Sequence, residues 1–353
     1  MRRRRPIPSQ GIDRDVSATH AGAAPGRCSM LRVAICGTFA ASLEPRVRAR
    51  LATPCEITLA DEKSVVSRMP DVDVLVTMAF TRDMANAAKR LRLIQVPGAG
   101  LDRIDRFAVP PGTWLANVYG HETGIAEYVL GAMLTLTRDL VRLDAALRRG
   151  TWESQWAVGG EPPAPFPELA GKTLGILGYG RIGQCLAPRA RAFDMTVLAI
   201  RRDVSQADAH ATVRGPEALD DVLAQSDGLA ITLPLTNDTR GLLGKRELSS
   251  MKRTAVLVNV ARAEVVDEDA LYAALAARTI AAAALDVWYR YPTSAGATLP
   301  ARRPFHELPN VLMTPHISGW TEGMMSARAR VIAENIERAA RGEPPLNLIP
   351  PSG

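Results

Sequence analysis

The sequence predicts an α/β protein with two doubly wound parallel sheets, and three observations support this fold class. Short apolar runs of strand length alternate with helix-like segments along the 353 residues, as in a parallel sheet covered by helices. A glycine-rich turn follows one of these runs in the middle of the chain. A long helical segment, Thr123–Arg149, separates the alternating runs into two series, and the chain is long enough for two domains.

The first series lies before the long helix. Its predicted strands are Leu31–Cys36, Ile57–Leu59, Val72–Thr77, Leu93–Val96 and Trp114–Val118. The segments Glu44–Leu51 and Thr81–Arg90 between them are predicted to be helices.

The long helix and the second series follow. Apolar residues of the helix from Ile125 to Leu147 fall on one stripe, and Gly150 ends it as the C′ residue. A proline-rich loop, Glu161–Pro167, comes next. The predicted strands of the second series are Thr173–Leu177, Thr196–Ile200, Gly228–Leu233, Ala255–Val260, Ala281–Leu285 and Val311–Thr314. An amphipathic helix over Glu322–Arg341 closes the fold.

Composition excludes several classes of protein. Apolar residues make up 47% and charged residues 23% of the chain, as in a globular protein, and no apolar run has membrane-spanning length. The net charge of +6 is concentrated in residues 1–29, which predict a disordered extension, so no basic face for nucleic acid is expected. This extension is Arg-rich like a transit peptide, but its two aspartates favour an extended start before Met30. The four cysteines have no metal-ligand spacing, so a cytoplasmic protein without a metal site is expected.

The turn Gly178-Tyr179-Gly180-Arg181-Ile182-Gly183 predicts a dinucleotide site. It follows a predicted strand and begins a helix, the context that this motif requires. Its glycines permit a tight turn, a close approach of a pyrophosphate and close packing of helix on strand, and the helix N-terminus attracts phosphate. The alternative is a glycine-rich turn that binds nothing.

The end of the next strand indicates which dinucleotide binds. An acidic residue there would hydrogen-bond the ribose of NAD, whereas arginine would accept the 2′-phosphate of NADP. The strand ends at Arg201 and Arg202, with Asp203 beyond. Two guanidinium groups suit a phosphate, so we expect NADP to be preferred over NAD. The alternative is that both arginines are solvated and Asp203 binds the ribose.

Three charged or titratable residues follow strands of the second series. Arg262 comes just after Ala255–Val260, Asp286 directly after a strand ending at Leu285, and His316 after a third strand. Because ligands bind at the carboxyl ends of parallel strands, these side chains are expected to converge. Each taken alone could be a loop charge or a structural residue.

These residues resemble the D-isomer-specific 2-hydroxyacid dehydrogenase family, in the manner of the glyoxylate/hydroxypyruvate reductases. The resemblance is collinear from Leu31 to about Leu348. It rests on Gly98-Ala99-Gly100-Leu101-Asp102, Ala126-Glu127, Gly171-Lys172-Thr173, the turn Gly178–Gly183, Leu233-Pro234-Leu235-Thr236, Asn259–Asp267, Leu285-Asp286-Val287-Trp288 and Thr314-Pro315-His316.

The resemblance implies roles for the site residues. Arg262 would bind the carboxylate and the 2-oxo group of the substrate, and the backbone N–H groups of Ala99 and Gly100 would hold that carboxylate from the other domain. His316 would donate the proton in reduction and accept it in oxidation. Asp286 would hold the nicotinamide carboxamide. The expected cofactor site comprises Gly178, Gly180, Arg181, Ile182, Gly183, Arg201, Arg202, Leu233, Pro234, Thr239, Val260, Asp286, His316 and Gly319.

The resemblance also implies an architecture and a reaction. A Rossmann cofactor domain, residues 119–316, would be inserted in a flavodoxin-like substrate domain of residues 30–118 plus 317–348. A homodimer would form through the long helix. The expected reaction transfers a hydride between NAD(P)H and a small 2-oxoacid, such as glyoxylate or hydroxypyruvate, to give the (R)-2-hydroxyacid. Phosphoglycerate dehydrogenation is an alternative.

One residue departs from the family pattern. Tyr291 stands where most members carry the glutamate that pairs with the catalytic histidine. A neutral phenol cannot stabilise imidazolium as a carboxylate does, so His316 is expected to titrate lower than in a Glu-paired relative. The phenol could still orient the ring by a hydrogen bond. Formate oxidation and a non-catalytic, dinucleotide-sensing scaffold remain alternatives, although His121 replaces the asparagine of the formate site.

Overall fold

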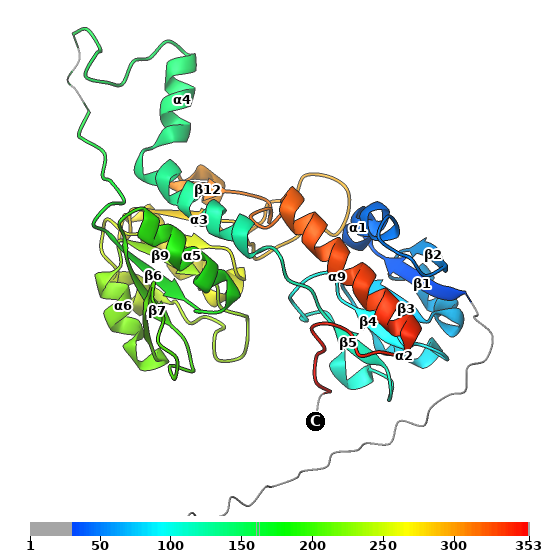
Figure 1. The fold of residues 1–353 in the computed structure, drawn as a ribbon. Helices are drawn as coiled ribbons and strands as arrows, with labels where there is room; N and C mark the ends of the chain where they lie inside the picture. The colour runs from blue at the N-terminus through cyan, green and yellow to red at the C-terminus, as the bar shows by residue number, and fades with distance from the viewer. Residues whose placement is uncertain (1–29, 160, 162, 352–353) are drawn as a thin grey trace, which may run out of the picture.

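The computed structural model describes residues 30–159, 161 and 163–351, and Figure 1 shows two α/β lobes. The extension predicted over residues 1–29 lies outside the described residues. One lobe contains a five-stranded sheet in the order β2-β1-β3-β4-β5, and the other a seven-stranded sheet in the order β12-β11-β10-β9-β6-β7-β8. Neighbouring strands within both sheets pair in parallel. The predicted fold class is therefore confirmed.

The central strands of the first sheet are apolar on both faces, as strands covered by helices on both sides must be, whereas the edge strand β2 is partly exposed. Its strands are β1 (Leu31–Cys36), β2 (Cys55–Ala60), β3 (Val74–Thr77), β4 (Leu93–Gln95) and β5 (Trp114–Ala116). Helix α1 (Thr38–Arg48) packs on one face together with α9 (Glu322–Arg341), and α2 (Arg82–Ala87) packs on the other. The predicted strands are all present, with ends displaced by at most two residues.

The second sheet carries the glycine-rich turn at the end of its first strand. Its strands are β6 (Thr173–Leu177), β7 (Thr196–Ile200), β8 (Thr212–Arg214), β9 (Gly228–Ile231), β10 (Val256–Asn259), β11 (Ala282–Leu285) and β12 (Val311–Met313). Its helices are α3 (Glu122–Thr137), α5 (Arg181–Ala192), α6 (Leu219–Gln225), α7 (Lys245–Ser250) and α8 (Glu268–Ala276). Strand β8 escaped prediction because its three residues are partly exposed at the sheet edge and form no apolar run.

The single helix predicted over Thr123–Arg149 is wrong. The chain forms α3 and then a separate α4 (Leu140–Arg148), because Asp139 between them adopts the left-handed conformation with φ of 51°. Aspartate tolerates this conformation better than most residues. Helix α3 packs on the second sheet, whereas α4 projects away from that lobe (Figure 1). The predicted apolar stripe is consequently buried only along α3.

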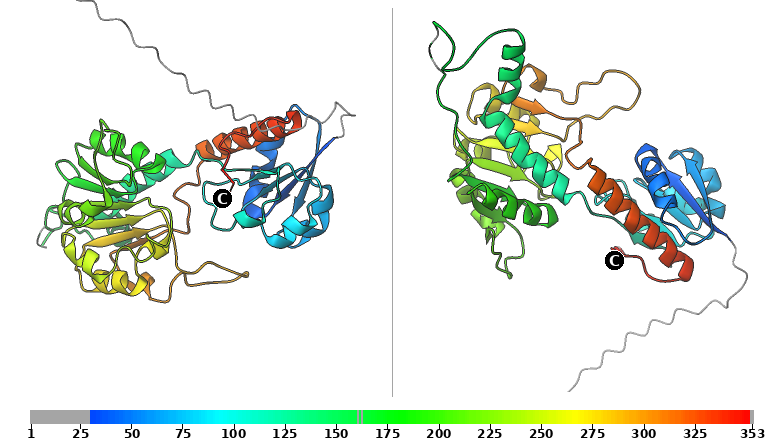
Figure 2. Two further views of the ribbon diagram at one scale, coloured as in Figure 1. Left: turned by 90° about the horizontal axis from the view of Figure 1, so that it is seen from below. Right: turned by 45° about the horizontal axis from the view of Figure 1, so that its top comes forward.

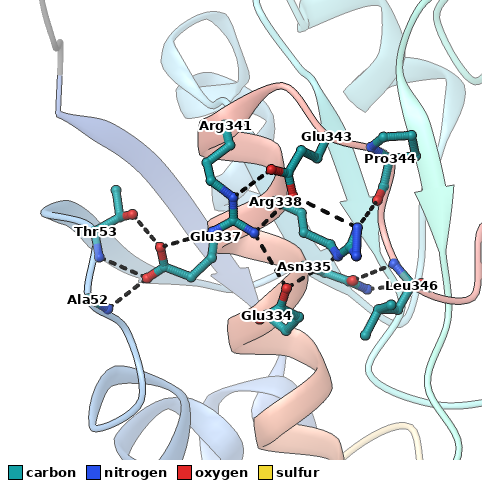
Figure 3. A network of polar contacts seen from close by, with 10 residues as sticks. All are labelled: Ala52, Thr53, Glu334, Asn335, Glu337, Arg338, Arg341, Glu343, Pro344 and Leu346. Atoms are coloured by element: carbon teal, nitrogen blue, oxygen red, sulfur yellow. Dashed lines mark hydrogen bonds and ion pairs between the residues drawn. The ribbon is translucent and has the colours of Figure 1, made fainter.

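Helix α9 returns the chain to the first sheet. Its observed ends match the prediction, because the Thr321 hydroxyl accepts from Met324 N at 3.2 Å and Gly342 ends the helix with φ of 71°. Figure 3 shows how its last turns are held: Glu337 accepts hydrogen bonds from the backbone N–H groups of Ala52 and Thr53. Asn335 also donates to Gln95 Oε1 at 2.6 Å in the core.

Two chain segments join the lobes, one between β5 and α3 and the other between β12 and α9 (Figure 2). Because all strands of each sheet are parallel, the loops that follow their carboxyl ends lie at one end of each sheet. The loops of the two lobes meet beside these joining segments. Within the described part of the chain, no helix combines the length and apolarity needed to cross a bilayer.

Candidate active site

Arg262 lies just beyond β10 and reaches across to the first lobe. The buried amide of Asn259, the last residue of β10, holds this turn: its Nδ2 donates to Arg262 O at 3.0 Å and its Oδ1 accepts from Ala261 N at 3.1 Å. The Arg262 Nη2 donates to Asp102 Oδ2 at 2.7 Å. The guanidinium is therefore fixed at the junction of the lobes while already engaging a carboxylate.

The loop after β4 lies against this guanidinium. A Cβ on Gly100 would come 2.7 Å from Arg262 Nη2, so the absence of a side chain at Gly100 lets the guanidinium lie close to the backbone here. Asn117 donates from Nδ2 to Ala99 O at 3.0 Å and braces the loop from β5. The structure thus brings Ala99, Gly100 and Arg262 together, as the sequence predicted.

His316 lies beyond β12 with its ring against Tyr291. The Tyr291 hydroxyl and His316 Nδ1 are 2.7 Å apart, so the hydrogen bond considered from the sequence is present. The Trp288 N–H also points to the same hydroxyl, at 3.4 Å. Because the phenol engages Nδ1, the other ring nitrogen, Nε2, is left for a ligand. His316 has a φ of 59°, an unusual conformation for a residue other than glycine.

Asp286 holds the loop that carries His316. Its fully buried carboxylate accepts from Thr314 Oγ1 at 2.6 Å and from the backbone N–H groups of Ile317 and Ser318, both at 2.8 Å. Tyr128 extends the network through its hydroxyl, 2.7 Å from Thr314 Oγ1. In this structure Asp286 therefore positions His316, a role additional to the cofactor contact expected from the sequence.

The pKa of His316 is lowered from its usual value. Loss of hydration is the main cause; the negative charge of Asp286 opposes the shift and the positive charge of Arg262 adds to it. That His316 titrates lower than in a Glu-paired relative stays a prediction, because Tyr291 is not among the causes of this shift. Since reduction needs the protonated imidazole, the reductive rate should decline as pH rises, beginning at a lower pH than for an unperturbed histidine.

Replacing Tyr291 by glutamate is expected to move this decline to higher pH. A carboxylate beside the ring stabilises imidazolium and should raise the pKa of His316. Profiles of kcat/KM against pH for 2-oxoacid reduction measure the shift. Tyr291→Phe is the matched control, because it removes the hydrogen bond without adding charge and should lower kcat without moving the decline upward. An unchanged profile in Tyr291→Glu contradicts the assignment.

The glycine-rich turn has the geometry of a phosphate cradle. Gly178 has a φ of 100°, and a Cβ there would lie 2.8 Å from Leu233 N; a Cβ on Gly183 would lie 3.0 Å from Gly178 O. A Cβ on Gly180 would meet nothing within 4 Å, so open space lies above the turn. Helix α5 begins directly after Gly180 without a side-chain cap or an acidic residue in its first turn. These features fit a dinucleotide pyrophosphate.

The remaining residues expected at the cofactor site surround this turn. The backbone N–H groups of Gly178 and Tyr179 donate to Ile200 O, so Arg201 at the end of β7 lies beside the turn. Its guanidinium donates to the carbonyls of Asp203 and Gln206.

Other predicted residues have structural contacts of their own. Arg181 stacks on the Tyr119 ring, with Cζ 4.1 Å from the ring centroid. Thr239 braces the loop after β9 by donating to Pro234 O at 2.7 Å. Val260 is buried after β10, and Gly319 packs against His121, where a Cβ would lie 3.2 Å from His121 Cβ.

Several residues of the site had no role predicted from the sequence. Asp102 belongs to the quoted Gly98–Asp102 motif, but only the structure shows that it pairs with Arg262. Asn259 is the last residue of β10, and a buried amide at a strand end indicates a side chain that hydrogen-bonds the following turn. Tyr128 lies on the buried side of α3 with its hydroxyl aimed at Thr314, and no sequence pattern indicates that direction.

Comparisons with known proteins agree with this geometry. A family model described as the NAD-binding domain of D-isomer-specific 2-hydroxyacid dehydrogenases matches residues 130–318. The chain is 34% identical over 299 residues to a glyoxylate reductase of Korarchaeum cryptofilum, covering 82% of this chain and 86% of that protein.

Two further relatives are a longer protein and a protein with a crystal structure. A D-3-phosphoglycerate dehydrogenase of Methanocaldococcus jannaschii is 34% identical over 296 residues, 82% of this chain, but the match spans only 53% of that protein. The chain thus spans about half the length of such relatives. The crystal structure of an NADPH-dependent glyoxylate/hydroxypyruvate reductase of Sinorhizobium meliloti, with NADP and malonate, is 27% identical with a TM-score of 0.75, covering 91% of this chain and 97% of that one.

Proposed function

The chain belongs to the D-isomer-specific 2-hydroxyacid dehydrogenase family. We therefore propose that it reduces a small 2-oxoacid to the (R)-2-hydroxyacid with NAD(P)H. The observation that carries the proposal is the position of Arg262. Its guanidinium lies against the Gly98–Gly100 loop and holds a carboxylate, that of Asp102, at 2.7 Å. A substrate carboxylate has the same chemistry.

The side chains divide the work of reduction between them. Arg262 binds the substrate carboxylate and polarises the 2-oxo group, so that negative charge developing on the carbonyl oxygen is stabilised. The nicotinamide, when bound, supplies the hydride that the carbonyl carbon receives. His316 gives its proton from Nε2 to the carbonyl oxygen, which completes the alcohol. Tyr291 and the Asp286 network hold the His316 ring in place. Asp286 is also the proposed partner of the nicotinamide carboxamide.

A screen of 2-oxoacids tests the proposal. The purified protein is mixed with NADPH or NADH and single 2-oxoacids, and consumption of the reduced cofactor is followed. Turnover of glyoxylate, hydroxypyruvate or another 2-oxoacid is expected. Absence of turnover across the panel with both cofactors contradicts the proposal, provided that cofactor binding shows the protein to be folded.

We also propose that NADP is preferred over NAD. Arg202 is exposed beside the end of β7, and Arg201 holds the loop that follows. NADPH should give a kcat/KM about tenfold or more above that of NADH, because a phosphate gains charge-assisted hydrogen bonds from guanidinium groups. The double variant Arg201→Ala, Arg202→Ala should lose this preference, with the NADH value serving as its internal control. A clear NADH preference of the wild type contradicts the assignment.

The homodimer remains part of the proposal. Helix α4 and the segment after it expose Leu140, Val141, Leu147, Trp152 and Trp156, each by half or more of its surface. Such an apolar surface on a projecting arm favours a second copy as its partner. Light scattering after size exclusion should give twice the chain mass, and a monomer contradicts it. The three described cysteines are free thiols, which fits the proposed cytoplasmic location.

A further inference from the structure

Arg328 is a buried cation with no protein partner. It lies on α9, is only 8% exposed, and makes no hydrogen bond or ion pair with the described residues. It contacts the Phe39 ring, whose centroid lies 5.5 Å from Cζ. Burying a charge without a hydrogen-bonded partner is destabilising, so a guanidinium in this setting favours the binding of an anion.

The surroundings of Arg328 are also suited to an anion. Phe39 is the second residue of α1, whose N-terminus has no side-chain cap and no acidic residue in its first turn. The partial positive charge of this helix end therefore adds to that of the guanidinium. Phe39 lines a cavity of about 870 Å³ at the carboxyl edge of the first sheet, together with Met78 and Arg103.

The acidic residues nearby do not neutralise Arg328. Glu62 in the cavity wall is paired with Arg103 at 2.6 Å, and Asp61 accepts from the backbone of Lys63 and Ser64. Glu122 is the carboxylate that acts on Arg328 electrostatically, but it forms no ion pair with it within the described residues. Burial lowers the pKa of Arg328 to about 10, against the opposing effect of Glu122, so the group stays charged at neutral pH.

Contacts link this cavity to the reacting groups on two sides. Phe39 packs against Trp320, with ring centroids 5.7 Å apart, and Trp320 belongs to the loop that carries His316. On the other side, Met78 lies 3.5 Å from the Cβ position of Gly98, in the loop that contacts Arg262. The cavity therefore adjoins the two loops that would hold a substrate, and the Phe39 ring in its wall contacts Arg328.

His121 lies within electrostatic reach of both Arg262 and Arg328. Its Cβ packs beside Gly319, and its buried Nδ1 has no hydrogen-bond partner. Burial is the main cause that lowers the pKa of His121 to about 4; the charge of Arg328 acts in the same direction, Glu122 opposes it, and Arg262 adds to it. His121 is thus neutral at pH 7 and leaves a free ring nitrogen at the site.

We propose that Arg328 binds a second anionic group, carried at the end of the substrate's side chain, with the N-terminus of α1 assisting. The inference rests on the proposed function and specifies its substrate class: 2-oxoacids that bear a carboxylate or a phosphate beyond the carbon next to the carbonyl. Arg262 takes the carboxylate beside the reacting carbonyl, and Arg328 takes the distal anion. The buried guanidinium then has the partner that the protein does not provide.

Matched substrates test the inference. 2-Oxoglutarate and 2-oxopentanoate have the same chain length and differ in a terminal carboxylate; 3-phosphohydroxypyruvate and hydroxypyruvate differ in a phosphate. The wild type should favour the member with the distal anionic group in at least one pair. Arg328→Met should lower kcat/KM for that member by about tenfold to a hundredfold, the range for losing a hydrogen-bonded charge partner. The value for the member without the distal anion should stay within about threefold. Arg328→Lys should restore part of the loss. Arg330 is an exposed arginine two residues along α9, and Arg330→Met should change kcat/KM for neither member of the pair.

An equal loss for both members of each pair, or no loss, overturns the inference. A binding measurement separates this result from failure of the proposed function. The melting temperature of the NADPH-loaded protein should rise with 2-oxoglutarate or 3-phosphohydroxypyruvate more than with 2-oxopentanoate or hydroxypyruvate, and Arg328→Met should abolish the difference. This shift without turnover supports the anion site but contradicts the proposed reaction. Turnover only of 2-oxoacids without a distal anion, without the shift, supports the reaction but contradicts the anion site.

Discussion

Replacement of His316 by glutamine is expected to lower kcat for 2-oxoacid reduction by about a hundredfold to ten-thousandfold, the usual contribution of a positioned general acid. Glutamine can fill the same space and donate a hydrogen bond, but it cannot give up a proton at neutral pH. KM should change little, because Arg262 still binds the carboxylate. Steady-state kinetics with the preferred 2-oxoacid measure both quantities.

The binding of NADPH serves as the control for this variant. The glycine-rich turn and the end of β7 do not depend on the imidazole, so the Kd for NADPH, measured by fluorescence, should stay close to that of the wild type. A His316→Gln protein that binds NADPH normally and keeps its kcat contradicts the assignment of the proton donor. A residual pH dependence like that of the wild type would point to another titrating group.

Replacement of Arg262 by lysine is expected to lower kcat/KM by about a hundredfold or more, although the positive charge is kept. The planar guanidinium can hold a carboxylate with two parallel hydrogen bonds, whereas an ammonium group offers a single compact charge. Asn259 and Gly100 shape the site for the guanidinium, since Nη2 already lies within 2.7 Å of the Cβ position of Gly100. The lysine variant would therefore lose the paired hydrogen bonds to the substrate carboxylate.

Two comparisons distinguish a lost substrate contact from a disturbed fold. Arg262→Lys should raise KM and lower kcat together, because both the carboxylate and the polarised carbonyl lose a partner. Asp102→Asn, which removes the carboxylate that Arg262 holds in this structure, should leave the arginine available and cost far less. Activity of Arg262→Lys within a few-fold of the wild type contradicts the role given to the guanidinium.

The sequence predicted the sheets well because their strands are buried on both faces. Parallel strands such as β6 and β10 then read as unbroken apolar runs. It predicted both ends of α9 because Thr321 and Gly342 are strong capping residues. The break between α3 and α4 was not predictable, because the apolar stripe continues through Asp139 and only tertiary packing shows that α4 leaves the sheet.

The same limit applies to the site. Arg262, Asp286 and His316 were predictable from their places at strand ends, since the parallel topology collects them at one edge. Asp102 and Arg328 were not predictable as site residues, because both lie far in sequence from the other site residues and no sequence pattern indicates contact. Whether an arginine such as Arg328 is buried without a partner depends on how elements far apart in the sequence pack around it, and no local sequence pattern indicates that.

Product analysis shows directly whether this chain is an (R)-specific 2-oxoacid reductase. The wild-type protein is incubated with NADPH and the 2-oxoacid it turns over, and the hydroxyacid is quantified by chiral chromatography against the NADPH consumed. One (R)-2-hydroxyacid is expected for each NADPH, with formation abolished or reduced to trace levels in His316→Gln. Formation of the (S)-product, or binding of NADPH with no hydroxyacid formed from any 2-oxoacid, would contradict this expectation.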